Sequence, residues 1–302
     1  MKNDLKPAKE FSEQLELLKS RNLKISNEEK ASEILSRVNY YKLSGYYFQL
    51  KQRESENFVD GTTFEQIYNI YLFNKRLSSL IMDLMETIEI SLKTVVANYI
   101  GLKYGPLAHL NKNNFRSDYH YDHFIKTLNH MQENILKRMK RIHNKQNDKI
   151  FIKHNIDKYG NLPIWVAVEI ISFSTISKLY SNLLPHDQKQ ISKLYYSKVG
   201  PQNLENWFFI STNIRNRCAH HSRLYNSYLS SNLKLFKEMK QDGINNKSLF
   251  AYFVIVKKIL RNDDQWKRFI IELKCLISEF ESDIDLKRLA FPSNWLEILK
   301  KQ

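Results

Sequence analysis

The sequence is poor in the residues that build disulfide scaffolds and membrane spans. Its 302 residues include two cysteines, Cys218 and Cys275, which lie far apart and have no CxxC spacing. This excludes a disulfide scaffold and a thiolate zinc site, and it is typical of proteins from the reducing cytoplasm. No apolar run approaches the roughly 20 residues that a membrane helix needs. We therefore expect a cytoplasmic protein that does not enter a membrane.

Glycine and proline are also scarce, with seven and six residues respectively. A sheet-rich fold with many tight turns normally uses more of both. Long stretches without a helix breaker, with apolar residues at helical spacing, therefore predict an all-α protein. We expect residues 1–10 to form a loose leader without a signal sequence, and residues 11–302 to form a single domain.

Two apolar segments are predicted to form the centre of this domain. A capping box precedes a long predicted helix from Phe64 to about Gly101. After a turn, the segment Ile164–Leu184 is apolar on most sides, which predicts one helix at the centre of the bundle. Glu169 lies inside this run, and a buried carboxylate needs a partner. We therefore expect a basic group beside it, with Arg215 as one candidate.

Positive charge is the strongest compositional signal. Lys and Arg number 47 against 32 Asp and Glu, which gives a formal net charge of +15. Such an excess concentrates polyanions and suggests a nucleic-acid partner, although a solvated basic surface is equally compatible. The densest cluster lies in a predicted helical stretch from Tyr119 to about Lys153. This basic ribbon, a candidate for tracking RNA phosphates, consists of Lys137, Arg138, Lys140, Arg141, Lys145, Lys149 and Lys153.

Histidines and aromatic residues form two further groups. His120 and His123 can share a helix face, but no third ligand has suitable spacing, so we expect no metal site. The segment Asn39–Phe48 is an aromatic cluster around Gly45. A packed corner, in which the tyrosines cover a helix end, is the favoured interpretation. A base-stacking platform remains the alternative.

The segment from Trp207 to Tyr225 contains the residues best suited to chemistry. Asn216 and His220 are four apart and share a helix face, and so do Arg217 and His221. Arg215 and His220 are five apart, about 140° around an ideal helix. They converge only if Arg215 reaches across, the helix is distorted, or a second copy of the chain contributes.

An arginine, an amide and an imidazole suit metal-free RNA cleavage. Imidazole moves protons near neutral pH, and arginine stabilises charge on phosphoryl oxygens. RNA supplies the 2′-hydroxyl as nucleophile, so the products are a 2′,3′-cyclic phosphate and a 5′-hydroxyl. No acid or cysteine partner for peptide hydrolysis and no phosphate-binding glycine loop accompany the histidines. In the structural alternative, Arg215 and His220 cap a helix and pair with Glu169 or a carbonyl.

A resemblance to a known family changes the weight of these alternatives. Asn213–His221 closely resembles the R-N-x-x-A-H signature of HEPN ribonucleases. More specifically, the chain resembles the Abi-like family of phage-defence proteins over roughly residues 10 to 300. Three further segments carry this likeness: Asn39–Tyr46, Leu162–Trp165 followed by Ser172-Phe173, and Phe291–Trp295. The family often has a glycine where this chain has Ser174, which affects local helix packing more than the site.

The resemblance implies a HEPN-like helical bundle with additional N-terminal and C-terminal helices and a HEPN-type core at about residues 62–230. It also implies a homodimer, metal-independent endoribonuclease activity without a cofactor, and growth arrest on infection. Some relatives are restrained by a small structured RNA. Arg215, Asn216 and His220 carry over as the catalytic residues. His221, Arg217 and Glu169 are secondary candidates.

Two other functions remain open at the level of sequence. In the first, the protein is a non-catalytic RNA-binding regulator or scaffold, which predicts salt-sensitive binding without cleavage. In the second, it transfers a nucleotidyl or AMP group to another molecule. No recognisable partner motif accompanies that activity here, so we rank it last.

Overall fold

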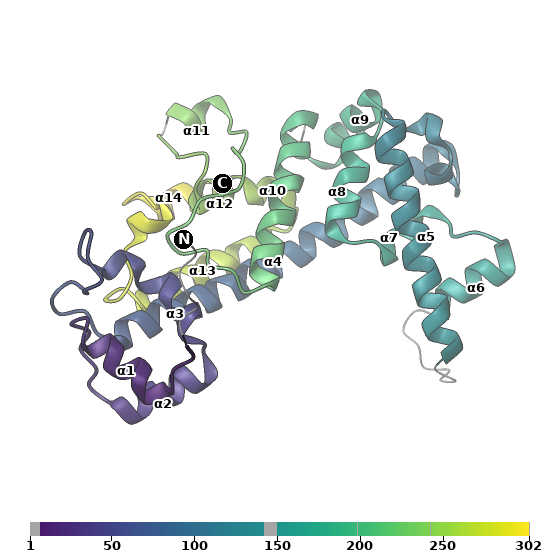
Figure 1. Cartoon of the computed structure of the whole chain (residues 1–302). Helices are drawn as coiled ribbons and strands as arrows, with labels where there is room; N and C mark the ends of the chain where they lie inside the picture. Colours follow the sequence, from purple (N-terminus) through teal and green to yellow (C-terminus); the bar gives the residue numbers. More distant parts are fainter. Residues whose placement is uncertain (1–6, 142–149, 198, 242, 302) are drawn as a thin grey trace, which may run out of the picture.

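The computed structural model describes residues 7–141, 150–197, 199–241 and 243–301, which form an all-α protein (Figure 1). Within these ranges there are 14 α-helices and four short 3-10 helices, and β-structure is limited to three isolated bridges. The predicted fold class is therefore confirmed. Residues 1–6 of the expected leader lie outside the described residues. A search of the described helices found none with the length and apolarity required to cross a membrane.

The longest helix, α4 (Phe64–Tyr104), is the axis of the fold. Its 41 residues extend over about 60 Å. It begins as predicted, because the Thr63 hydroxyl accepts a hydrogen bond from the Gln66 N–H at 3.0 Å. It ends at Tyr104, three residues beyond the predicted Gly101, and its C-cap is Gly105, which has a φ of +90°. Gly101 instead allows another helix to approach closely, since a Cβ there would lie 3.3 Å from the Ile164 side chain.

The main bundle is built along α4, which runs diagonally through the molecule in Figure 1. Its centre is filled by large side chains that are fully buried, including Trp207, Phe208 and Tyr252. The helices packed on α4 from the second half of the chain are α7 (Ile164–Ile170), α8 (Phe173–Asn182), α9 (Pro185–Tyr195), α10 (Pro201–Ala219), α12 (Leu249–Leu260) and α13 (Asp263–Glu279). The short elements are η1 (Phe48–Leu50), η2 (Ala108–Leu110), η3 (Lys112–Asn114), η4 (Leu286–Leu289) and α11 (Lys237–Gln241).

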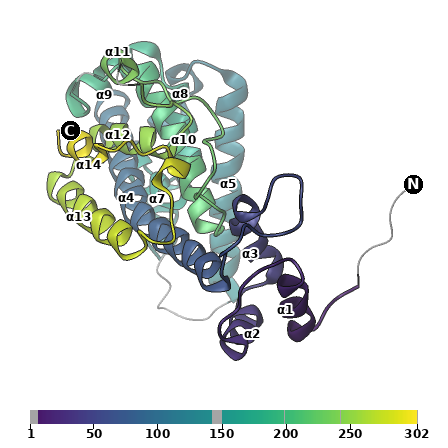
Figure 2. The same cartoon turned by 90° about the vertical axis from the view of Figure 1, so that its left-hand side faces the viewer.

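The N-terminal helices form a second, smaller hydrophobic cluster with the start of α4. They are α1 (Phe11–Lys19), α2 (Glu28–Arg37) and α3 (Tyr40–Tyr47). α2 begins after its N-cap Asn27, whose side chain accepts from the Lys30 N–H at 2.8 Å. Figure 2 shows this group at one end of the molecule. Because α3 also packs directly on α4, it connects the small cluster to the main bundle.

The expectation of one central helix over Ile164–Leu184 is wrong. The segment forms two helices, α7 and α8, which are separated at Ile171 and Ser172. The Ser172 hydroxyl accepts from the Thr175 N–H at 3.2 Å, and this N-cap bond starts a new helix. The predicted stretch Tyr119–Lys153 is likewise described as two helices, α5 (Asp118–Arg141) and α6 (Ile150–Tyr159), which pack against each other.

The C-terminal segment packs on the bundle through the aromatic residues that the sequence indicated. The Phe291 ring lies 4.9 Å from that of Phe250 and 5.5 Å from that of Trp295, centroid to centroid. Phe291 and Trp295 are both buried. The Trp266 indole N–H also donates to the carbonyl of Leu299 in α14 (Trp295–Lys300). Phe291 and Trp295 therefore hold the C-terminal tail against the bundle.

Candidate functional site

The end of α10 carries the residues expected to be catalytic. The inner face of α10 packs on α4 and α8 through Trp207, Phe208 and Ile214, which are at most 1% exposed. Its outer face carries Phe209, which is 46% exposed, followed by the exposed Asn216 and His220. Positions i, i+7 and i+11 return to the same side of a helix. The helix therefore presents Asn216 and His220 outward, in line with an exposed aromatic ring.

The two neighbouring histidines stand at the point where α10 ends. His220 is the C-cap, and its N–H donates to the Asn216 carbonyl at 2.9 Å. His221 follows with a φ of +53°, in the left-handed region that residues other than glycine seldom occupy. Its N–H donates to the Cys218 carbonyl at 3.0 Å. This reversal of the backbone turns the chain back toward α4 immediately after His220.

Among the expected catalytic residues, all of which the structure describes, the one side-chain hydrogen bond joins Arg215 and Asn216. The Arg215 Nη1 donates to the Asn216 Oδ1 at 3.2 Å. Arg215 is half-buried and Asn216 is exposed. No ion pair joins Arg215 to an acid among the residues that the structure describes. The guanidinium is therefore oriented by Asn216 and keeps donors free for an anion.

Arg217, a secondary candidate, instead holds the loop that follows α10. Its guanidinium donates to the Tyr228 carbonyl at 3.0 Å, to the Ser227 hydroxyl at 2.5 Å and to the Arg223 carbonyl. Burial lowers the pKa of this guanidinium, but an arginine remains charged at neutral pH. Arg217 thus orders residues 223–228 through three hydrogen bonds, whereas the Arg215 guanidinium makes one side-chain hydrogen bond, to Asn216, among the described residues.

The same loop is fixed to α4 by Asn74, which sequence reasoning missed. The buried Asn74 Oδ1 accepts from the Leu224 N–H at 2.7 Å and from the Tyr225 N–H at 3.0 Å. A signal was present, because Asn74 is an amide within the apolar stripe of α4, between Ile70 and Leu77. A polar side chain at a core position requires hydrogen-bond partners. The backbone of the loop supplies them.

The aromatic segment Asn39–Phe48 also contacts the loop. The Lys42 ammonium donates to the His221 carbonyl, and the Arg223 guanidinium donates to the Gly45 carbonyl. Tyr46 and Tyr47 are buried, as the packed-corner interpretation expects, whereas Tyr41 is 85% exposed. Helix α3 is therefore a structural support of the loop at the end of α10, although these two contacts join residues 179 and 178 positions apart in sequence.

The expectation that Glu169 is buried and paired with Arg215 is wrong. Glu169 is exposed, because α7 has only seven residues and buries Ile164, Ala167, Val168 and Ile170 on its inner side. No hydrogen bond or ion pair between Glu169 and Arg215 occurs among the described residues. The structural alternative for Arg215, a partner of a buried carboxylate, therefore loses its basis.

The cysteine inside the motif is not a nucleophile at neutral pH. Cys218 is 3% exposed, and burial raises the pKa of its thiol to about 11. Since the thiolate is the reactive form, this environment keeps the residue inert. Cysteine–histidine hydrolysis is therefore not supported by the site, in agreement with the sequence.

The basic ribbon is only partly described. Arg138, Lys140 and Arg141 belong to the last turns of α5, and Lys145 and Lys149 lie outside the described residues. Lys137 is exposed and lies 3.4 Å from the Glu133 carboxylate. Figure 1 shows the C-terminal half of α5 and α6 as an arm at one side of the molecule, apart from the end of α10. The predicted path for RNA from the ribbon to His220 stays a prediction.

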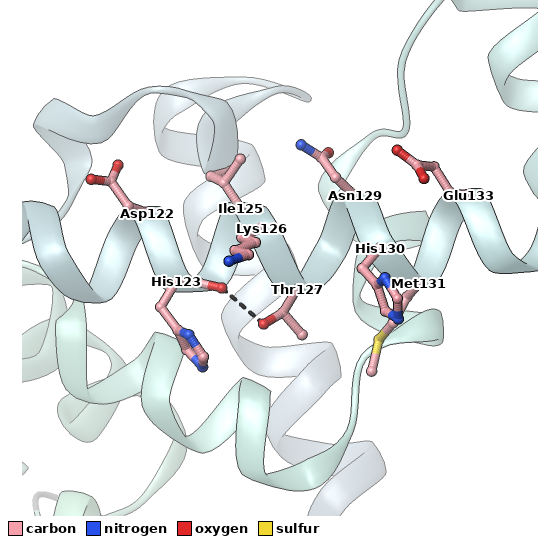
Figure 3. Close-up of a pocket in the computed structure, with 9 residues that line it drawn as sticks. All are labelled: Asp122, His123, Ile125, Lys126, Thr127, Asn129, His130, Met131 and Glu133. Carbon is pink, nitrogen blue, oxygen red and sulfur yellow. Dashed lines mark hydrogen bonds between the residues drawn. The ribbon is translucent and has the colours of Figure 1, made fainter.

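The preceding part of α5 borders a surface hollow of about 720 Å³. Its nine lining residues all belong to α5, and Figure 3 shows His123 pointing away from Asp122 and Glu133. The Thr127 hydroxyl donates to the His123 carbonyl at 2.8 Å. Among the described residues, no three His, Cys, Asp or Glu side chains gather as metal ligands would. The hollow is therefore a groove along one helix rather than a built site.

Comparisons with known proteins place the chain in a family. Neither the curated proteins nor the solved structures contain a significant match. The model of one family, described as Abi-like protein, matches residues 33–226, well over half of the 302 residues. This range includes the aromatic segment and the whole of α10 and ends inside the loop that Asn74 fixes, whereas the Phe291–Trp295 segment lies beyond it. The chain belongs to the Abi-like protein family.

Proposed function

We propose that this protein acts in abortive infection, a bacterial defence against phage, as a cytoplasmic toxin that cleaves RNA without a metal ion. The family supports the role in defence. The observation that carries the proposed activity is the arrangement at the end of α10. Arg215 is oriented by Asn216, and His220 is exposed on the same helix within six residues. No buried acid neutralises this arginine among the described residues.

In the proposed reaction, the RNA 2′-oxygen attacks the adjacent phosphorus and the bond from phosphorus to the 5′-oxygen breaks. The 2′-hydroxyl gives its proton to a base, and the departing 5′-oxygen receives one from an acid. His220 fills one of these roles, and Arg215 stabilises the charge on the phosphoryl oxygens. Asn216 positions Arg215 through the 3.2 Å hydrogen bond.

A homodimer would complete this set of groups. The outer face of α10 carries Phe209, which is 46% exposed, and His220 on one side. An exposed ring beside polar groups suits burial against a second copy of the same surface. Two helices that meet in this way bring the Arg215 of one subunit beside the His220 of the other, so the two groups can act together across the dimer. A small structured RNA that covers this surface would restrain the toxin.

Cleavage by purified protein tests the proposal. Wild type should produce RNA fragments with 2′,3′-cyclic phosphate and 5′-hydroxyl ends. His220→Ala should lower the rate at least about 100-fold, the lower range for loss of a general acid or base. The exposed His123→Ala on α5 is the matched control and should cleave like wild type. Identical RNA patterns from wild type and His220→Ala would reject the nuclease and favour the non-catalytic RNA-binding alternative.

Mixing two inactive variants tests whether the site is shared. Arg215→Ala and His220→Ala each remove one group from every subunit. If the site spans a dimer, mixed dimers contain one site with both groups, and mixing restores part of the activity. If each chain carries a complete site, the mixture stays as inactive as its components.

A further inference from the structure

A cleft lies between α3 and α4, beside the end of α10. This cleft has a volume of about 600 Å³, within the range of about 300–1,000 Å³ typical of small-ligand pockets. It is bounded by three segments that are distant in sequence. Its lining residues include Tyr46 of α3, Tyr71, Lys75 and Ser79 of α4, and Ala219 and His221 at the end of α10.

The cleft is built where the two signature segments of the sequence meet. Lys42 binds the His221 carbonyl, and Arg223 binds the Gly45 carbonyl, so each segment donates to the other. Asn226 adds a third connection, since its Nδ2 donates to Gln49 Oε1 at 2.8 Å. These cross-connections hold α3 against the turn after α10. These contacts fix the walls of the cleft and use none of the side chains that line it, since His221 takes part through its backbone carbonyl alone.

The exposed polar groups of the cleft suit an anionic ligand. None of its ten lining residues is acidic, and Lys75 is exposed with no ion pair among the described residues. The His221 imidazole lines the same cleft and can donate as well, whereas the Ser79 hydroxyl already donates to the Lys75 carbonyl at 3.3 Å. Lys42 and Arg223 add positive charge from the neighbouring wall. A phosphate group is the natural counterpart of such a set.

The remaining walls are aromatic. The Tyr46 and Tyr71 rings lie 5.6 Å apart, edge to face. Tyr46 is 1% exposed, and its hydroxyl has no hydrogen-bond partner among the described residues. Buried hydroxyls are normally paired, so this one requires a partner that the chain itself does not provide. Burial raises the pKa of Tyr46 to about 12, so at neutral pH the group is a hydrogen-bond donor as well as an acceptor.

We propose that this cleft binds one nucleotide of the RNA substrate, with its base against Tyr71 and hydrogen-bonded to the Tyr46 hydroxyl, and its phosphate at Lys75 and His221. This inference rests on the proposed function. Consecutive Cα atoms are about 3.8 Å apart, so a nucleotide held by His221 lies next to His220. The cleft thereby positions the neighbouring phosphodiester at the outer face of α10. His221 is a positioning residue, while His220 belongs to the chemistry.

Binding of an RNA that cannot be cleaved tests the cleft separately from catalysis. A 2′-O-methylated RNA hexanucleotide lacks the nucleophile, and its fluorescence anisotropy reports binding at a fixed salt concentration. Lys75→Ala should weaken binding about tenfold, as expected for one charge-assisted hydrogen bond to phosphate. The matched control is the exposed Lys189→Ala on α9, which makes the same change in charge near the opposite end of α4. It should bind within twofold of wild type.

Tyr46→Phe provides the second variant. It keeps the ring and removes only the unpaired hydroxyl, so the fold is preserved. The affinity should fall about threefold, as for a neutral hydrogen bond. Unchanged affinity in Tyr46→Phe would overturn the role of this hydroxyl. If Lys75→Ala binds the hexanucleotide as tightly as Lys189→Ala, the cleft is not a nucleotide site.

Cleavage kinetics distinguish the failure of this inference from that of the proposed function. A positioning cleft predicts that Lys75→Ala raises KM about tenfold and changes kcat less, whereas His220→Ala lowers kcat. Cleavage that depends on His220 but not on Lys75 rejects the cleft and keeps the nuclease. Binding that depends on Lys75, without any cleavage by wild type, rejects the nuclease and keeps the cleft.

Discussion

A single substitution at Asn74 tests whether this residue attaches the loop that follows α10, residues 223–228, to α4. Its side-chain oxygen accepts from the Leu224 and Tyr225 N–H groups at 2.7 and 3.0 Å, in a buried environment. Asn74→Ala leaves two buried donors without a partner, and each costs about 1–3 kcal/mol. The free energy of unfolding should therefore fall by about 2–6 kcal/mol. This is a large share of the roughly 5–15 kcal/mol that stabilises a typical domain.

Urea denaturation measures this loss through the midpoint and the slope of the unfolding transition. Asn98→Ala is the matched control on the same helix, because Asn98 is exposed and, within the described part of the chain, its side chain accepts from the Tyr195 hydroxyl alone, at 3.2 Å. The control should change stability by no more than about 0.5 kcal/mol. Asn74→Ala should also reduce RNA cleavage below the unfolding midpoint, since the loop carries His221. A loss under about 1 kcal/mol, with unchanged cleavage, would refute the assignment of Asn74 as the anchor.

Two further substitutions test other parts of the same framework. His109 is 1% exposed with Nδ1 unpartnered among the described residues, and burial lowers its pKa from the usual 6.5 to about 4. Because the unfolded chain binds the proton at higher pH, this contribution to stability is complete above pH 6.5 and is lost as the pH falls toward 4. This loss reaches about 3 kcal/mol. Chemical denaturation at each pH should therefore show that the free energy of unfolding falls less steeply with decreasing pH in His109→Gln than in wild type. An equally steep fall in both proteins would contradict the role of His109. Arg217→Lys keeps the charge but cannot form the three bonds of the planar guanidinium, so urea denaturation should show a loss of about 2 kcal/mol. Stability equal to wild type would show that Arg217 does not order the loop.

The features that sequence predicted well are those decided by local contacts. The start of α4 follows from Thr63, whose hydroxyl bonds an N–H three residues ahead. The prediction for Ile164–Leu184 was wrong for a related reason. Its apolar residues suggested one continuous helix, but Ser172 caps a new helix in the middle of the segment. A serine within an apolar run deserves the same weight as one at its edge.

At the candidate site, too, the sequence predicted what local spacing decides and missed the contacts between residues far apart in the chain. The helical spacing of Asn216 and His220 is a local property, so the outward face of α10 could be predicted. The different environments of Arg215 and Arg217 could not, because they depend on where residues 223–228 fold back. Asn74 and Leu224 are joined across 150 positions, and that pairing exists only after α4 and α10 have packed. Such contacts require the tertiary structure.

The end of α10 explains why two adjacent histidines can have different roles. In a continuous helix, His220 and His221 would point about 100° apart and both would stay near the helix surface. Here the helix ends at His220. The left-handed backbone of His221, with a φ of +53°, turns the chain back toward α4 at that point. His221 thus lines the cleft with Tyr46 and Lys75, while His220 remains exposed beside Asn216. His221→Gly should accept the left-handed backbone without strain and remove only the imidazole. We expect this variant to raise KM and to leave kcat nearly unchanged, because His221 binds the RNA while His220 takes part in the chemistry. A loss of kcat as large as that of His220→Ala would assign both histidines to the reaction.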